Sequence, residues 1–257
     1  MQDLFSLKDK AIVITGSSRG IGKDMAIRFS QFGGKLIISS RKIESSEKVA
    51  EQIRKEGGMA FSKTCNISDK SQCESLIDFC VEKYGGIDIL VCNAASNPYY
   101  GNLAEIPDEL FDKIMNNNVK SNLWLCKKAI PFFKKNKKSS IIIVSSIAGL
   151  QGVKNLGAYS ISKTADIGLI RSLAVELGEY NVNVNGLCPG IIKTDFAKAL
   201  WENPKILSDV EKIAPLGRIG TTDEVSGAAI LLASKAGSFI TGQVITMDGG
   251  VTIAGRS

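Results

Sequence analysis

The chain of 257 residues contains no histidine. Histidine is the most frequent general base in enzymes and a very frequent metal ligand, so its absence removes both roles together. Ser-His-Asp hydrolysis and the zinc chemistry of an HExxH helix are therefore excluded. We expect no metal site, and any proton transfer has to use another side chain.

Long apolar runs are also missing. No segment approaches the roughly 18 uncharged apolar residues of a membrane-spanning helix, and the first residues are not apolar enough for a signal peptide. We therefore expect a cytoplasmic protein with no membrane partner. The six cysteines form no CxxC pair, and Cys65, Cys92 and Cys188 lie in apolar runs, which predicts reduced thiols in the core.

Charge gives no sign of nucleic-acid binding, although the formal net charge is +6. Basic residues are spread along the chain apart from one cluster, which consists of Lys134, Lys135, Lys137 and Lys138. This cluster follows a helix-like run that contains Pro131, so we interpret it as a solvated helix end or loop. A modest positive balance also suits an anionic dinucleotide.

Strand-like and helix-like segments alternate along the whole chain. Runs rich in β-branched residues occur at 11–15, 35–39, 87–93, 140–145, 182–187 and 244–247, and helical spacing occurs at 21–33, 45–57, 70–84, 108–130 and 158–180. The strand runs are apolar at consecutive positions, which indicates strands buried on both faces. With 44% apolar residues and no compositional break, this predicts one α/β domain over 1–257, a Rossmann-like doubly wound parallel sheet with helices on both faces.

One segment, 191–220, interrupts the alternation with mixed polar and apolar residues that include Pro204 and Pro215. Ligands of α/β sheets bind beyond the carboxyl ends of the strands, where this segment would lie. We expect a mobile lid over the substrate. An ordinary surface helical hairpin is the alternative.

A glycine-rich turn, Thr15-Gly16-Ser17-Ser18-Arg19-Gly20-Ile21-Gly22, connects the first strand run to a helix. We expect Gly16 to allow a tight turn, Gly20 to let the backbone approach a pyrophosphate, and Gly22 to permit close helix packing. The helix N-terminus offers unpaired amides to phosphate. The spacing GxxxGxG differs from the general GxGxxG fingerprint, but the order of strand, turn and helix predicts a dinucleotide site that includes Ser18 and Ile21.

The end of the second strand run bears on the choice between NAD(H) and NADP(H). A site for NAD places Asp or Glu here to hold the ribose 2′-hydroxyl, but this chain has no carboxylate before Glu44. Arg41, together with Arg19, is suited to a 2′-phosphate, and Ser40 adds a hydroxyl. NADP(H) is therefore the expected cofactor, with NAD(H) as the alternative.

Tyr159 and Lys163 are four residues apart in a helix-like segment and so share one face. A tyrosine hydroxyl with its ordinary pKa near 10 is a poor base at neutral pH, and lowering that pKa to roughly 7 takes about 4 kcal/mol. A lysine ammonium one turn away in a partly desolvated site supplies much of it. Ser146 ends the preceding strand run, thirteen residues before Tyr159.

Together these motifs closely resemble the short-chain dehydrogenase/reductase family, and the resemblance covers essentially the whole chain. It rests on the glycine turn, Asn93-Ala94-Ala95, Asn118, Ser146, the Tyr159 and Lys163 pair, and Pro189-Gly190 with Thr194. The resemblance implies nicotinamide-dependent interconversion of a ketone or aldehyde and an alcohol. Tyr159 would transfer the proton, Ser146 would hydrogen-bond the substrate oxygen, and Lys163 would lower the tyrosine pKa and hold the nicotinamide ribose. Asn118 would fix a water that relays protons from the lysine, while Asn116 and Asn117 would be incidental neighbours.

The resemblance also implies cofactor contacts. The stretch from Pro189 to Thr194 would pass along the nicotinamide, with Gly190 in the turn, Ile192 contacting the carboxamide by its backbone and Thr194 by its hydroxyl. Two departures stand out: Ala95 replaces a usual glycine after Asn93 and Ala94, and Asn66, before Ile67, replaces a usual aspartate beside the adenine. An amide still accepts and donates, so the adenine contact is expected without the charge.

Substrate identity is less constrained. We expect a pocket lined by 96–100, 150–156 and lid residues Phe196, Leu200 and Trp201, which favours a hydrophobic ketone or aldehyde and is similar to the carbonyl and retinal reductases of the family. The first alternative is a 3-oxoacyl-[acyl-carrier-protein] reductase. A non-catalytic dinucleotide-binding regulatory protein is the alternative from another class, although such proteins typically lose the tyrosine or the lysine. Family resemblance further implies a homotetramer or homodimer that pairs through the helices holding Asn118 and Tyr159.

Overall fold

The computed structural model describes residues 4–136 and 138–254. Its sheet has seven strands, all parallel, in the order β3-β2-β1-β4-β5-β6-β7. The strands are β1 (Ala11–Ile14), β2 (Lys35–Ser40), β3 (Met59–Thr64), β4 (Ile89–Cys92), β5 (Ser139–Val144), β6 (Val182–Pro189) and β7 (Val244–Met247). The α-helices are α1 (Gly20–Gln31), α2 (Ile43–Lys55), α3 (Lys70–Tyr84), α4 (Asp108–Met115), α5 (Ser121–Asn136), α6 (Gly157–Leu177), α7 (Lys198–Trp201), α8 (Pro204–Ile213) and α9 (Thr222–Ala233).

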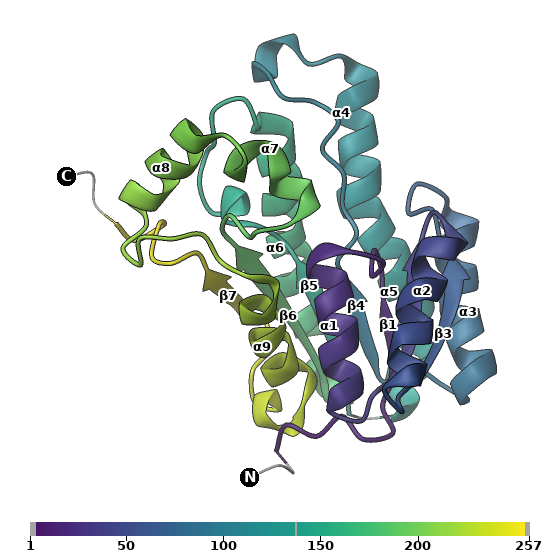
Figure 1. Ribbon diagram of the computed structural model, residues 1–257. Helices are drawn as coiled ribbons and strands as arrows, with labels where there is room; N and C mark the ends of the chain where they lie inside the picture. Colours follow the sequence, from purple (N-terminus) through teal and green to yellow (C-terminus); the bar gives the residue numbers. More distant parts are fainter. Residues whose placement is uncertain (1–3, 137, 255–257) are drawn as a thin grey trace.

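Helices cover both faces of this sheet (Figure 1). Side chains of successive strand residues point to opposite faces, so Ile12 and Ile14 of β1 join one core with α1, α2 and α9. Val13 joins the other core with α3, α5 and α6. The predicted fold is confirmed: this is a single-domain, doubly wound α/β protein with two buried layers.

Local sequence signals explain where individual helices end. Asp69 caps α3 by accepting hydrogen bonds from the amides of Ser71 and Gln72, and Gly85 closes the helix in the left-handed region at φ 77°. These two residues bound the helix at the predicted positions 70–84. Thr221 and Glu224 form a reciprocal capping box at the start of α9.

The structure departs from the predicted elements at β3 and in the long helix over 108–130. β3 is an edge strand in which Met59 and Phe61 are exposed, and its second half, 62–64, is polar, so it lacks the continuous apolar run of a buried strand. The long helix is divided by a π-helical turn, η2 (Asn116–Lys120), and α5 continues past Pro131. Such turns often mark functional sites.

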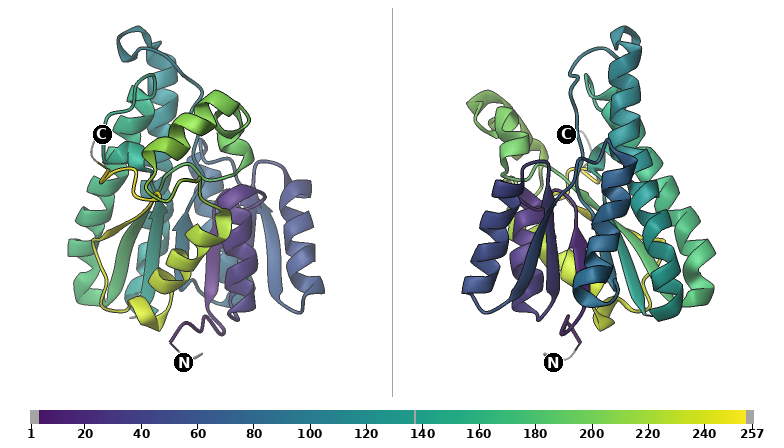
Figure 2. Two further views of the ribbon diagram at one scale, coloured as in Figure 1. Left: turned by 60° about the vertical axis from the view of Figure 1, so that its left-hand side comes forward. Right: turned by 90° about the vertical axis from the view of Figure 1, so that its right-hand side faces the viewer.

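The carboxyl ends of the strands meet at one edge of the sheet. α7 and α8 lie beyond this edge on one side and α4 on the other (Figures 1 and 2). The strand order reverses between β1 and β4, because β1 lies beside β2 on one side and β4 on the other. Open α/β sheets bind ligands at such a reversal. In the described part of the chain, no helix is both long and apolar enough to cross a membrane.

Candidate active site

The predicted site residues all lie at or just beyond the carboxyl ends of the strands or on the helices that follow them. Residues predicted from distant parts of the sequence are thereby gathered at one edge. In chain order they are Gly16, Ser18, Arg19, Gly20 and Ile21 after β1; Ser40 and Arg41 at the end of β2; Asn66 and Ile67 after β3; Asn93 and Ala94 after β4; Asn118 in η2; Ser146 after β5; Tyr159 and Lys163 in α6; and Pro189, Gly190, Ile192 and Thr194 from the end of β6.

The turn after β1 requires glycine on backbone grounds. Gly16 and Gly20 have φ angles of 63° and 55°, in the left-handed region that residues with a Cβ atom rarely adopt. At Gly22 a Cβ atom would lie 2.5 Å from Asn93 Nδ2 and from the Gly16 carbonyl oxygen. Asn93 Nδ2 donates to the carbonyl oxygens of Thr15 and Gly16 at 2.9 and 3.2 Å, so the residue after β4 braces the turn after β1.

This turn is arranged to receive phosphate. α1 begins at Gly20 with no side-chain cap, and its first turn contains no acidic residue. Uncapped amides at a helix N-terminus attract anions. A Cβ atom added to Gly20 would lie 3.4 Å from Thr194 Cγ2, so the turn after β1 and the segment after β6 face each other with little room for side chains. The donor set and the glycine cradle fit a dinucleotide.

The end of β2 is tied to the glycine turn. Ser17 Oγ accepts from the Ser39 amide at 2.9 Å, and the Ser17 amide donates to the Ser39 carbonyl oxygen at 2.9 Å. Arg19 and Arg41 are both exposed, and neither takes part in an ion pair within residues 4–136 and 138–254. The Ser40 hydroxyl is already bonded to the Lys42 carbonyl oxygen at 2.8 Å.

Ser146 stands at the start of the short helix η3 (Ile147–Gly149), directly after β5. Its hydroxyl oxygen accepts from the Ala148 amide at 3.1 Å, which fixes the side chain and leaves its own proton to donate. α6 is bound to the same strand end, because Ser145 Oγ donates to the Lys163 carbonyl oxygen at 2.8 Å. At Gly149 a Cβ atom would lie 2.7 Å from that carbonyl group, so the glycine is what allows α6 to lie this close.

Lys163 is buried, with its Nζ 5.7 Å from the centre of the Tyr159 ring. The ammonium donates to the Val144 carbonyl oxygen at 2.9 Å and to Asp166 Oδ2 at 3.0 Å. Burial opposes the charged form of the lysine and so lowers its pKa. The negative charge of Asp166 and, to a smaller extent, the Tyr159 hydroxyl outweigh this effect, so the pKa of Lys163 lies above its ordinary value. The predicted pair is therefore accompanied by a carboxylate that we did not predict.

Asn118 is fully buried in η2, and in the described part of the chain its side chain forms no hydrogen bond with Lys163. Its side chain accepts from the Ser96 amide at 2.8 Å, and its Nδ2 donates to the Ser96 carbonyl oxygen and to Ser162 Oγ at 3.0 Å each. Asn117, which we expected to be incidental, is also buried and donates to Ser96 Oγ at 2.9 Å. That expectation is wrong: both asparagines hold the loop after β4.

The segment 191–220 is closed at its base by a parallel bridge between Ile192 and Gly220. The Lys193 amide donates to the Gly220 carbonyl oxygen at 2.9 Å, and Trp201 Nε1 donates to the Thr194 carbonyl oxygen at 2.8 Å. The side chains of Phe196 and Leu200, predicted to line the pocket, lie outside the described residues. Gly101, the residue after the first predicted pocket loop (96–100), donates its amide to the Asn155 carbonyl oxygen of the second at 3.0 Å.

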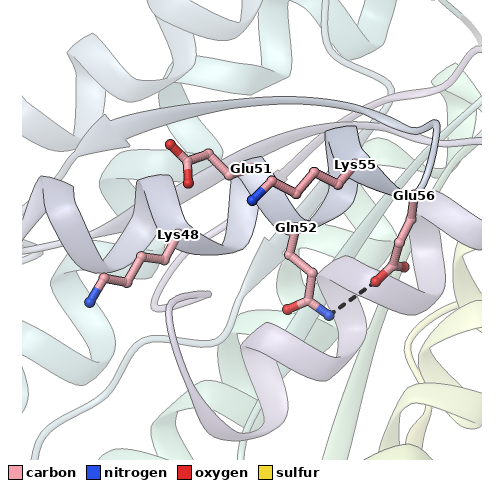
Figure 3. Close-up of a pocket in the computed structure, with 5 residues that line it drawn as sticks. All are labelled: Lys48, Glu51, Gln52, Lys55 and Glu56. Carbon is pink, nitrogen blue, oxygen red and sulfur yellow. Dashed lines mark hydrogen bonds between the residues drawn. The ribbon is translucent and has the colours of Figure 1, made fainter.

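The surface and the cysteines complete the description of the molecule. Figure 3 shows a surface hollow on α2 whose lining includes Lys48, Glu51 and Lys55, three exposed side chains of mixed charge. All six cysteines are buried and free, as predicted. Among the described residues no cluster of three or more acidic or cysteine side chains is arranged to hold a metal. Lys134 and Lys135 end α5 as predicted, whereas Lys137 lies outside the described residues.

Comparison with known proteins gives consistent similarities. A family model described as Enoyl-(Acyl carrier protein) reductase matches residues 16–252. Dehydrogenase/reductase SDR family member 4 from Bos taurus is 38% identical over 244 residues, which cover 95% of this chain and 88% of the bovine protein. A 7α-hydroxysteroid dehydrogenase complexed with NADH and 7-oxo glycochenodeoxycholic acid matches at a TM-score of 0.94 and 33% identity over 97% of both chains. A gluconate 5-dehydrogenase from Burkholderia cenocepacia J2315 in complex with NADP and tartrate matches at a TM-score of 0.94 and 29% identity over 99% of both.

Proposed function

The chain belongs to the short-chain dehydrogenase/reductase family and interconverts a carbonyl compound and an alcohol with a nicotinamide dinucleotide, and we propose how its residues do so. Tyr159 transfers the proton and Lys163 supports it electrostatically. Ser146 donates a hydrogen bond to the substrate oxygen. The observation that carries this assignment is the attachment of α6 to the end of β5, which holds Tyr159, Lys163 and Ser146 in one place.

Each group has a distinct task in carbonyl reduction. Negative charge develops on the carbonyl oxygen, and the Ser146 hydroxyl stabilises this charge by donating its proton, while the hydrogen bond from the Ala148 amide keeps the hydroxyl oxygen in place. The Tyr159 hydroxyl gives its proton to that oxygen. The Lys163 ammonium favours the phenolate that remains. In alcohol oxidation the same groups act in reverse.

The cofactor lies, in our proposal, along the carboxyl edge of the strands. When bound, its nicotinamide supplies or accepts the hydride. The amides at the start of α1 hold the pyrophosphate, with Gly16 and Gly20 providing the close approach. Ser18 and Ile21 contribute backbone, while Asn66 and Ile67 contact the adenine. Asn93, Ala94, Pro189, Gly190, Ile192 and Thr194 line the nicotinamide end.

We propose that NADPH is preferred over NADH, because Arg19 and Arg41 are exposed near the end of β2 without an acidic partner among the described residues. Replacing Arg41 with alanine removes a charge-assisted hydrogen bond to the 2′-phosphate, worth about 1.5–3 kcal/mol. We expect KM for NADPH to rise about 10- to 100-fold, with KM for NADH nearly constant. Steady-state kinetics with both cofactors measure this. Lys48→Ala, which removes an exposed positive charge from α2, is the control, and an equal rise for both cofactors would contradict the proposal.

The substrate proposed is a hydrophobic ketone or aldehyde that binds beneath the 191–220 segment acting as a lid. Tyr100 and Leu150 support this choice, since they belong to the two pocket loops and are 68% and 46% exposed. Apolar surface of this kind is covered when a ligand binds.

A panel of carbonyl compounds tests this proposal by the rate of NADPH oxidation. We expect kcat/KM to rise with the apolar area of the ketone, and to be lowest for ketones that carry a carboxylate. Preference for a 3-oxoacyl group on an acyl carrier protein would establish the alternative reductase activity. Failure of every carbonyl compound to oxidise NADPH would favour the non-catalytic binding protein.

We also propose that the protein is cytoplasmic and assembles into a homotetramer or homodimer. Exposed apolar side chains support assembly. Leu123 on α5, Ile161 and Val175 on α6, and Phe239 before β7 all face solvent in the single chain. An exposed apolar set on neighbouring helices is typical of an interface between subunits.

A further inference from the structure

The proposed function does not use one charged group of the site, the buried carboxylate of Asp166. Its side chain has no exposed surface, and that of Lys163 is 2% exposed. The two form a buried ion pair three residues apart on α6, with Nζ and Oδ2 separated by 3.0 Å. Burying a carboxylate is costly unless it is paired and hydrogen-bonded, so this position has a specific role to explain.

Asp166 is also connected to Asn118. Its Oδ1 accepts from Asn122 Nδ2 at 2.9 Å, and the same Nδ2 donates to the Asn118 carbonyl oxygen at 2.7 Å. The side chain of Asn122 is buried between the π-helical turn and α6. A continuous path of hydrogen bonds therefore joins the Asn118 carbonyl oxygen to the Lys163 ammonium entirely through protein side chains.

Three other ionisable side chains lie near this pair. On α6 the neighbour is Tyr159, on β6 it is Cys188, and on β4 it is Cys92. Burial raises the pKa of the Cys188 thiol. The neighbouring Cys126 on α5, together with burial, holds the pKa of Cys92 well above its usual range. Lys163 and Asp166 are the two members of this group that form a buried ion pair.

Resting on the proposed role of Tyr159 and Lys163, we propose that Asp166 is a positioning residue for the reaction. It fixes the Lys163 ammonium against β5 and compensates its charge, and Asn122 links it to the Asn118 carbonyl oxygen. The consequence concerns the proton that Tyr159 and Lys163 hold together. A nearby negative charge makes that proton harder to remove, so Asp166 sets the pH at which the pair first ionises.

The sign of the effect follows from charge. Removing the carboxylate lowers the pH at which the Tyr159 and Lys163 pair loses its first proton, whichever of the two groups releases it. Carbonyl reduction needs the protonated pair, so the alkaline limb of the plot of kcat against pH moves to lower pH for this direction. Alcohol oxidation needs the ionised pair, so its acid limb moves to lower pH as well. A general structural defect lowers both rates without moving the limbs.

The test is the pH dependence of kcat for both directions in wild type and Asp166→Asn. We expect both limbs to shift to lower pH by about one unit or more, since one charge about 3 Å away is removed from a buried site. Asp166→Ala, which leaves room for water, is expected to shift them in the same direction and serves if the asparagine variant does not fold. Thermal unfolding and NADPH binding establish that each variant is folded.

The matched control is Asp88→Asn. Asp88 also accepts a hydrogen bond from a lysine, Lys10, at 3.1 Å, but it precedes β4 at the opposite edge of the sheet. We expect the plots of kcat against pH for Asp88→Asn to coincide with those of the wild type in both directions. Unmoved limbs in a folded Asp166 variant overturn the inference while the proposed function stands. Full activity of Tyr159→Phe would instead overturn the proposed function itself.

Discussion

Replacing Tyr159 with phenylalanine lowers kcat for carbonyl reduction by about 10²- to 10⁴-fold, the usual contribution of a positioned general acid. The substitution removes one oxygen and keeps the ring beside the Lys163 ammonium. Because Ser146 and the glycine turn are unchanged, we expect KM for the cofactor to stay within a few-fold of the wild-type value. Steady-state oxidation of NADPH with the best ketone of the panel measures the loss.

Tyr180→Phe is the matched control for this experiment. Tyr180 lies in η4 (Gly178–Tyr180) after α6, where its ring packs against Lys134 Nζ at 4.1 Å. Its hydroxyl has no part in the proposed chemistry, so the variant should retain wild-type kcat. A Tyr159→Phe enzyme that keeps its rate within a few-fold would show that another group transfers the proton.

Lys163→Met is expected to abolish turnover and also to destabilise the fold. It removes the ammonium that supports Tyr159, and it leaves the fully buried carboxylate of Asp166 without its charged partner. Breaking a buried ion pair on one side typically costs about 3–5 kcal/mol. Urea unfolding at neutral pH measures the loss, with NADPH oxidation as the readout of activity.

The destabilisation has a defined pH dependence. Burial raises the pKa of Asp166 in the folded protein above that of the unfolded chain, and removing Lys163 raises it further. A group whose folded pKa is raised contributes stability at low pH and loses it as pH rises. The stability gap between Lys163→Met and wild type should therefore widen from about pH 4 towards pH 7.

A double variant separates the two effects. Lys163→Met combined with Asp166→Leu replaces the ion pair by apolar groups, which is often neutral or stabilising in a protein core. We expect stability to return towards the wild-type value while activity stays lost. Equal stability of wild type and Lys163→Met at neutral pH would mean that Asp166 carries no charge there.

The elements that follow from short-range patterns were predictable. Strands buried on both faces, such as β1 and β5, produce continuous apolar runs, and the turn at Gly16 and Gly20 needs a backbone conformation that favours glycine. β3 was not predicted because an edge strand is not buried on both faces, and the polar residues 62–64 end its apolar run after three positions. The π-helical turn gives no periodic signal of its own, so 108–130 looked like one helix.

The amino-acid sequence by itself determined the fold class, the glycine turn and the spacing of Ser146, Tyr159 and Lys163, because these depend on residue type and local periodicity. Only the tertiary structure decided how the site is completed. Asn122 is 44 residues from Asp166, yet a 2.9 Å hydrogen bond joins them once α5 and α6 lie on the same face of the sheet. The three-residue spacing of Lys163 and Asp166 is enough to predict that the two side chains share one helix face. Whether it was a solvated surface pair or a buried one depended on packing, and burial is what gives that carboxylate its effect on the reaction.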